Sequence, residues 1–145
     1  MIRPNYLQKG DTVAIVSTAR KVSKKELIPA LAILKNWELN VVLGNSIEAE
    51  EHQFAGNDNL RASDFQEMLD NPKIKAIWCA RGGYGTIRMI DLLDFSNFKN
   101  NLKWIIGYSD VTVLHSHLHQ LGFETLHAQM PVSIETKTAA CIQSL

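Results

Sequence analysis

The chain has 145 residues, a length typical of one domain, and is long enough to bury a core without help from disulfides or metals. Its 15 Lys and Arg residues balance 15 Asp and Glu residues, so no overall charge would attract nucleic acid or an anionic membrane. The chain also has no apolar run near the ~20 residues of a membrane span and no secretory signal pattern, which predicts a cytoplasmic protein.

Apolar runs of strand composition alternate with helical patterns along the sequence. The predicted strands are residues 12–17, 40–43, 74–80, 104–107 and 124–127. The predicted helices are one capped by Ser23 and reaching Trp37, one capped by Asn57 or Asp58 and ended by Asn71-Pro72, one over 87–93, and one over about 110–121 closed by Gly122. The alternation predicts an α/β fold: an open, doubly wound parallel sheet with helices on both faces, like an amidotransferase or flavodoxin-like nucleophile domain.

Two segments fit this pattern less well. Pro29 falls inside the first predicted helix, which must then kink there or begin late. Residues 45–58 are polar and irregular, and a long connection of this kind is expected to be more mobile than the sheet. The two cysteines, Cys79 and Cys141, are far apart without C-x-x-C spacing, which predicts free thiols.

A glycine-rich turn follows the strand at 74–80, where residues 81–85 read Arg-Gly-Gly-Tyr-Gly. Glycines allow backbone N–H groups to approach a ligand oxygen closely, as in an oxyanion hole. A phosphate-binding loop fits poorly, because position 88 is Arg where G-x-G-x-x-G needs glycine. A plain strand-to-helix turn remains an equal alternative.

A serine follows the next strand in the sequence Tyr108-Ser109-Asp110. A strand that runs through a tight turn into a helix is the arrangement of a nucleophile elbow, which makes Ser109 a candidate nucleophile. The G-x-S-x-G pattern is incomplete, since Gly107 is present but position 111 is Val. Taken alone, the segment favours a helix-capping serine over a nucleophile.

The carboxyl ends of parallel strands meet at one edge, so the turns at 81–85 and 108–110 are expected to share a pocket. A Gly82 or Gly83 amide and the Asp110 amide would then form an oxyanion hole. The Asp110 side chain is interpreted as structural, because acidic groups are favoured in the first turn of any helix. Arg81 is expected either to bind a substrate carboxylate or to pair with Asp110 or Asp91.

The histidines give a weak signal for metal. On a helix, His115 and His119 share a face and His117 does not, so the three cannot converge on one ion. Ser116 also stands where an H-E-x-x-H zinc site has glutamate. These residues are predicted to be packing or surface histidines and no metal is expected, whereas His127 ends the last strand and is a candidate to line the pocket or to serve as a structural histidine.

Four blocks occur in the order seen in L,D-carboxypeptidases, which are relatives of the microcin-immunity peptidases: residues 10–17, 61–64, 77–85 and 107–112. The resemblance covers nearly the whole chain, and the two glycine-containing blocks at 77–85 and 107–112 are specific in combination. It implies a cytoplasmic serine peptidase that removes the terminal D-alanine from muropeptide tetrapeptides without metal or cofactor.

Carried over by resemblance, Ser109 is the nucleophile, and the Asp110 amide with that of Gly82 or Gly83 forms the oxyanion hole. The residues expected to bind substrate are Arg81, Tyr84 and His127. The family's catalytic glutamate and histidine lie in a second, carboxyl-terminal domain. Residues 1–130 are therefore expected to be the nucleophile domain and 131–145 the start of a linker, with little activity in this chain alone and a homodimer at full length.

One block departs from the family pattern. Residues 128–131 read Ala-Gln-Met-Pro, where many relatives carry His-Gly-Pro-Met, and this leaves the substrate open. An immunity-type peptidase acting on a peptide-nucleotide antibiotic is one alternative. A non-catalytic module that binds a small anion at the same glycine-rich edge is another.

Overall fold

The computed structural model describes all 145 residues and contains one five-stranded sheet in the order β2-β1-β3-β4-β5. The strands are β1 (Thr12–Val16), β2 (Asn40–Leu43), β3 (Ile74–Cys79), β4 (Trp104–Gly107) and β5 (Leu126–His127). All four neighbouring pairs are parallel. The predicted open parallel sheet is therefore confirmed, and the strand order reverses direction between β1 and β3.

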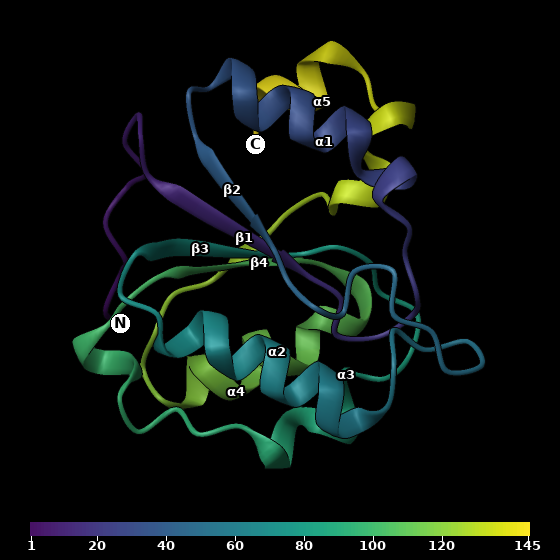
Figure 1. Cartoon of the computed structure of the whole chain (residues 1–145). Helices are drawn as coiled ribbons and strands as arrows, with labels where there is room; N and C mark the ends of the chain where they lie inside the picture. Colours follow the sequence, from purple (N-terminus) through teal and green to yellow (C-terminus); the bar gives the residue numbers. More distant parts are fainter.

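Helices cover both faces of the sheet, as Figure 1 shows. They are α1 (Lys24–Asn36), α2 (Asp58–Asp70), α3 (Thr86–Met89), α4 (Thr112–Gln120) and α5 (Ala139–Gln143). Helices α1 and α5 lie on one face, and α2, α3 and α4 lie on the other (Figure 1). None of them combines the length and the apolar composition that a membrane-spanning helix requires.

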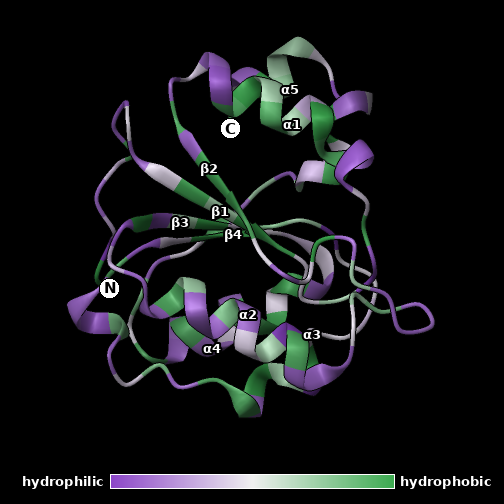
Figure 2. Cartoon of the chain, viewed as in Figure 1, coloured by the Kyte–Doolittle hydropathy of each residue, from purple (hydrophilic) through white to green (hydrophobic).

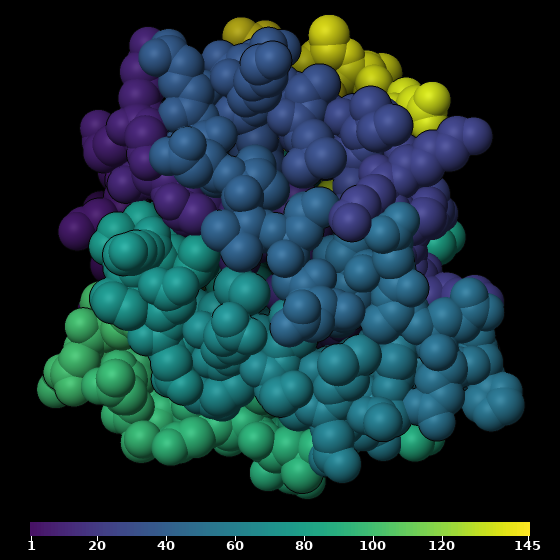
Figure 3. All heavy atoms as spheres, in the orientation of Figure 1, coloured from purple at the N-terminus to yellow at the C-terminus, as the bar shows by residue number.

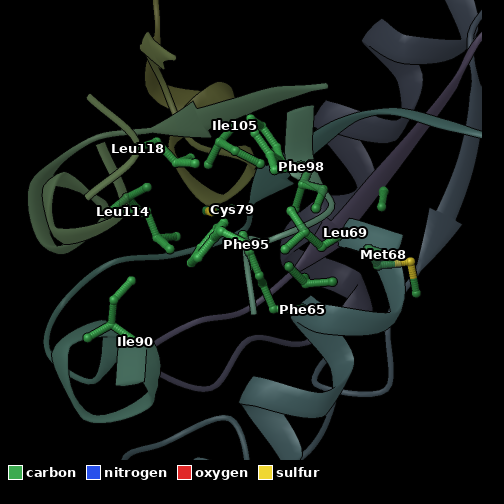
Figure 4. Close-up of a cluster of buried hydrophobic side chains, with 14 of the residues drawn as sticks. Phe65, Met68, Leu69, Cys79, Ile90, Phe95, Phe98, Ile105, Leu114 and Leu118 are labelled. Carbon is green, nitrogen blue, oxygen red and sulfur yellow. The ribbon is translucent and has the colours of Figure 1, made fainter. Parts of the chain in front are cut away.

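The core is divided by the sheet into two clusters of buried apolar side chains. The larger cluster lies under α2 and α4 and includes Phe65, Leu114 and Leu118 together with Ile105 of β4 (Figure 4). The smaller one lies under α1 and includes Trp78 and Leu27. In Figure 2 the central strands are mainly hydrophobic, whereas the loops at the strand ends are mainly hydrophilic. This division is what a sheet covered on both faces requires.

Side-chain caps set the starts of the two long helices. Ser23 and Glu26 form a reciprocal capping box before α1, and Asn57 caps α2 through the Leu60 amide at 2.8 Å. Helix α1 starts at Lys24 and continues through Pro29 to Asn36, so the late start considered from the sequence is wrong. The capping box fixes the first turn before Pro29 is reached.

The helical pattern at 87–93 is mostly not α-helix. Helix α3 has four residues and is followed by a 3-10 turn over Ile90–Leu92. The Ile87 and Leu92 side chains are about half exposed, at 51% and 53%, so the apolar positions do not form one buried stripe. Without such a stripe, tertiary packing does not extend the helix.

The connection at 45–58 is anchored at its start. The amides of Asn45 and Ser46 each donate to a carboxylate oxygen of Asp64 at 2.8 Å, and the Ser46 hydroxyl accepts from the Ser17 amide at 2.8 Å. Its tip projects as a hydrophilic loop (Figure 2) and closes through a bridge between Glu51 and Phe54. The greater mobility of this segment stays a prediction.

The last residues fold back onto the domain. A 3-10 helix, Pro131–Thr136, and α5 lie beside α1, and Ile134 is buried in the cluster beneath it. Figure 3 shows this terminal segment at the surface next to α1. The division at residue 130 into a domain and a linker stays a prediction.

Candidate active site

Ser109 occupies a sharp turn between β4 and α4. Its backbone φ is +59°, in the left-handed region, which costs a non-glycine residue about 1–2 kcal/mol. The residue opens a 3-10 turn, Ser109–Val111, and its exposed side chain caps no helix. The helix-capping alternative is therefore wrong. The strained turn has the backbone shape of a nucleophile elbow, and the nucleophilic role of Ser109 stays a prediction.

Val111 explains why the usual second glycine is missing. A Cβ on Gly107 would lie 2.9 Å from both γ-carbons of Val111, so the valine side chain fills the space that glycine leaves open. Close packing across this turn therefore needs one glycine, at 107, and a buried side chain at 111. The departure from G-x-S-x-G leaves the elbow intact.

The glycine turn lies directly against the serine turn. A Cβ built on Gly82 would stand 3.5 Å from both the Asp110 nitrogen and the Ser109 Cβ. The predicted proximity of the two turns is thus confirmed. The amides of Gly82 and Gly83 donate no hydrogen bond to another backbone or side-chain group, so both are free to bind a ligand oxygen.

Asp110 holds the two turns together. One of its carboxylate oxygens accepts a hydrogen bond from the Thr86 amide at 2.9 Å, where α3 begins after the glycine turn. The Thr86 hydroxyl in turn donates to the Thr18 hydroxyl at 2.9 Å in a buried contact. This supports the structural reading of the Asp110 side chain and links the loops that follow β1, β3 and β4.

Sequence reasoning assigned no role to Arg61, which lies beneath these loops. Its side chain is fully buried and donates to the carbonyls of Thr18 at 2.7 Å, Gly85 at 2.9 Å and Gly56 at 3.3 Å. It also forms an ion pair with Asp58. A Cβ on Gly85 would lie 2.8 Å from the guanidinium, so glycine is needed at 85 to let Arg61 reach its carbonyl partners.

Arg81 is already paired in this structure. Its guanidinium donates to the Glu26 carboxylate at 3.0 Å and to the Lys21 carbonyl at 3.1 Å. The expected alternative pairing with Asp110 or Asp91 is wrong, because the acidic partner of Arg81 is Glu26. Hydrogen bonding to Ser23, aided by Arg81, holds the pKa of Glu26 below its usual value and so keeps this pair ionised.

Tyr84 and His127 lie beside the two turns, Tyr84 in the loop after β3 and His127 at the end of β5. Tyr84, in the glycine turn, is 47% exposed, and its ring centroid lies 6.3 Å from that of Phe54 in the 45–58 connection. His127, at the end of β5, is exposed and lies 6.2 Å from the Tyr108 ring. Both side chains are available at the carboxyl edge of the sheet.

His115 and His119 line the same surface pocket whereas His117 packs elsewhere, so the three helix histidines do not converge, as predicted. His115 Nε2 donates to the Gly107 carbonyl at 2.9 Å, and its Nδ1 is buried without a partner. Burial lowers the pKa of His115, which favours the neutral ring. His117 packs against Phe95 at 4.8 Å between ring centroids, and His119 is exposed.

Cys79 lies at the end of β3, close to the glycine turn, but its thiol is expected to be unreactive. It is fully buried, and burial raises the pKa of its thiol to about 12. A thiol held neutral in this way is a poor nucleophile. Both cysteines are free, as predicted.

Comparison with known proteins places this chain among peptidases. Residues 13–128 match the family described as the LD-carboxypeptidase N-terminal domain. A probable murein peptide carboxypeptidase of Bacillus subtilis is 39% identical over 129 residues, which make up 88% of this chain and 40% of that protein. A murein tetrapeptide carboxypeptidase of Pseudomonas aeruginosa is 30% identical over 123 residues, which make up 84% of this chain and 40% of that protein.

The fold is also found in a solved structure. The microcin C7 self-immunity protein in complex with aspartyl sulfamoyl adenosine superposes with a TM-score of 0.88 at 23% identity, over 97% of this chain and 43% of that one. The present chain spans about two fifths of the length of the curated relatives named above. It belongs to the LD-carboxypeptidase family and corresponds to that family's amino-terminal domain.

Proposed function

We propose that this chain is the nucleophile-bearing half of a cytoplasmic serine L,D-carboxypeptidase that removes the terminal D-alanine from muropeptide tetrapeptides. The observation that carries the proposal is the strained, exposed Ser109 standing against the buried Gly82. Ser109 adopts the left-handed region although it is not glycine and caps no helix. Such strain is a feature of functional sites.

In the proposed reaction the Ser109 hydroxyl oxygen attacks the carbonyl carbon of the scissile L-to-D bond. The carbonyl oxygen becomes an oxyanion, and the amides of Asp110 and of Gly82 or Gly83 donate hydrogen bonds to it. The C–N bond then breaks and D-alanine leaves with the serine proton on its amine. Water hydrolyses the acyl-serine. Tyr84 and His127 line the pocket in this proposal.

A general base must take the proton from Ser109. None of the five histidines hydrogen-bonds to the Ser109 hydroxyl, and His115 is committed to the Gly107 carbonyl. We therefore expect the 145 residues alone to have little peptidase activity and the base to come from another part of the full-length protein. We also expect that protein to be a homodimer.

The decisive variant is Ser109→Ala in the full-length protein, assayed on a muropeptide tetrapeptide. We expect turnover to fall at least about 10³-fold, because the nucleophile is removed while the amides remain. Peptide binding should persist. Ser116→Ala, an exposed serine on α4, is the matched control and should leave turnover unchanged. Equal turnover in Ser109→Ala and wild type would rule out serine catalysis.

A second candidate is an immunity-type peptidase that cleaves a peptide-nucleotide antibiotic. The candidate is raised by the likeness to the microcin self-immunity protein, and the departure from the family pattern at 128–131 leaves the substrate open to it. The nucleophile would be the same, and the pocket would differ. Parallel assays on muropeptides and on aminoacyl-nucleotides separate the two, since each predicts turnover of one substrate class only.

A further inference from the structure

Arg20 lies across the glycine turn at the candidate site. A Cβ on Gly83 would stand 2.6 Å from Arg20 Cδ and 2.8 Å from its Nε, so the arginine stem rests on the bare α-carbon of that glycine. Gly83 has a φ of +118°, a value that suits glycine alone. The turn is thus shaped to accept the Arg20 side chain.

The other arginines near this edge of the sheet, Arg61, Arg81 and Arg88, each have an acidic partner, and so do two lysines. The pairs are Lys21 with Glu50, Lys24 with Glu48, Arg81 with Glu26, Arg88 with Asp58, and Arg61 with Asp58. Arg20 makes no ion pair, its side chain donates no hydrogen bond, and the residue is exposed. It is the one guanidinium beside the glycine turn with all its donors free.

The backbone of Arg20 is fixed in place. Its carbonyl accepts a hydrogen bond from the Ser17 hydroxyl at 2.6 Å, and the residue forms a bridge with Phe54. The next amide, that of Lys21, donates to the Gln53 carbonyl at 3.1 Å. Ligand binding therefore has to order only the side chain, which limits the entropic cost.

Arg20 also follows the strand at which the sheet order reverses. The loops after β1 and β3 leave neighbouring strands in the order β2-β1-β3. Open α/β sheets bind their ligands in the crevice at this switch point. Arg20 comes from the first of these loops and Gly83 from the second.

We infer that Arg20, rather than Arg81, binds the free carboxylate at the carboxyl end of the peptide substrate. This inference rests on the proposed carboxypeptidase function. A carboxypeptidase that removes one residue attacks the last peptide carbonyl, so the free carboxylate of its substrate lies one residue beyond that carbonyl. Consecutive α-carbons are about 3.8 Å apart. The Arg20 side chain lies on Gly83, the residue next to the Gly82 that contacts Ser109, and a guanidinium can hold both oxygens of a carboxylate.

The test compares two substrates in the full-length protein: a tetrapeptide ending in free D-alanine and the same peptide with a carboxyl-terminal amide. In Arg20→Gln we expect kcat/KM for the acid to fall about 100-fold, the effect of removing one partner of a charge pair. The value for the amide should change less than about 3-fold. Arg20→Lys should restore part of the acid preference, because it keeps the charge and loses the two-pronged geometry.

Arg81→Gln is the matched control, since Arg81 is already engaged by Glu26. It should keep the preference for the acid. If Arg20→Gln keeps that preference, or if Arg81→Gln is the variant that loses it, the assignment of Arg20 is overturned while the serine mechanism stands.

If the full-length protein cleaves neither peptide, the proposed function is overturned, and the role of Arg20 is then tested by a binding measurement. Calorimetry on full-length Ser109→Ala should then show that adding Arg20→Gln weakens binding of the acid peptide, with no such effect on the amide peptide. Equal binding of the acid peptide with and without Arg20→Gln would overturn the assignment.

Discussion

The two edges of the sheet use glycine for different purposes. At the carboxyl edge, Cβ atoms on Gly82, Gly83 and Gly107 would all meet neighbouring atoms, so backbone and side chains approach each other closely there. At the amino edge, Gly10 and Gly122 have positive φ, but a Cβ added to either would meet no atom within 4 Å. Glycine at the amino edge serves the turn alone, whereas at the carboxyl edge it also makes room for the site.

The same contrast holds for the two fully buried cations, which lie near opposite ends of α2. Arg61, in the first turns of α2, binds carbonyls of three loops that surround the candidate site. Lys103, just before β4, donates to the carbonyls of Met68 at 2.9 Å and Asn71 at 2.8 Å, where α2 ends. One cation organises the site and the other closes a helix.

The largest effect is expected from Arg61→Met. The variant leaves three carbonyls without their donor and leaves Asp58 with Arg88 as its one remaining cation, which should cost about 3 kcal/mol or more of unfolding free energy. Urea denaturation measures this cost. Turnover of the full-length protein should also fall under conditions where the variant is fully folded, because the glycine turn is no longer held. Full activity in the folded variant would contradict the role given to Arg61.

Gly82→Ala should separate function from stability. The added methyl would meet Asp110 N, Ser109 Cβ and Met130 Cε at 3.4–3.5 Å, so the fold can accept it. It would nevertheless occupy the space beside the proposed oxyanion amides, and we expect turnover to fall about 100-fold, as on loss of one oxyanion donor. Gly122→Ala at the other edge is the control for activity. Unchanged turnover in Gly82→Ala would place the oxyanion elsewhere.

Lys103→Met should lower the unfolding free energy by about 1–2 kcal/mol near neutral pH, because two helix-end carbonyls lose their donor. Turnover should be unaffected, in contrast with Arg61→Met. Denaturation and activity assays on the same preparations test both statements. Loss of turnover in the folded variant would remove the distinction between the two edges.

Lys103 also makes stability depend on pH. Burial lowers the pKa of Lys103 to about 8, below the value of about 10.4 in an unfolded chain. Between these values the unfolded state binds more protons, so the contribution of Lys103 to stability rises with pH. The stability of wild type relative to Lys103→Met should therefore increase between pH 7.5 and 10, and a constant difference would contradict the lowered pKa.

The smallest effect is expected from Ser109→Gly. Relief of the left-handed strain, about 1–2 kcal/mol, is partly cancelled by the greater freedom of glycine in the unfolded chain, about 0.5–1 kcal/mol. We expect a net gain of about 0.5 kcal/mol in thermal or chemical denaturation. Ser109→Ala, which keeps the strain, should show no gain.

The fold could be predicted from the sequence because its signals are local. Five apolar runs and the caps at Ser23 and Asn57 each depend on a few neighbouring residues. The proximity of the glycine and serine turns followed from strand direction alone. The helix at 87–93 was overestimated, because its apolar residues face more than one side and only packing shows that.

The supporting residues of the site could not be found in this way. Arg61 reaches Thr18, which is 43 positions away, and the partner of Arg81 is Glu26, 55 positions away. Such pairings are set by the order of strands in the sheet. A charged residue on the buried side of a helical pattern, as Arg61 is, was the one local signal available.

The most direct test of the account is to trap the acyl-enzyme in the full-length protein. Acid quenching during turnover of a muropeptide, followed by mass spectrometry of proteolytic fragments, should find the shortened peptide attached to Ser109. The adduct should be absent from Ser109→Ala. Steady turnover with no adduct on Ser109 under any quench condition, together with normal activity of Ser109→Ala, would contradict the account.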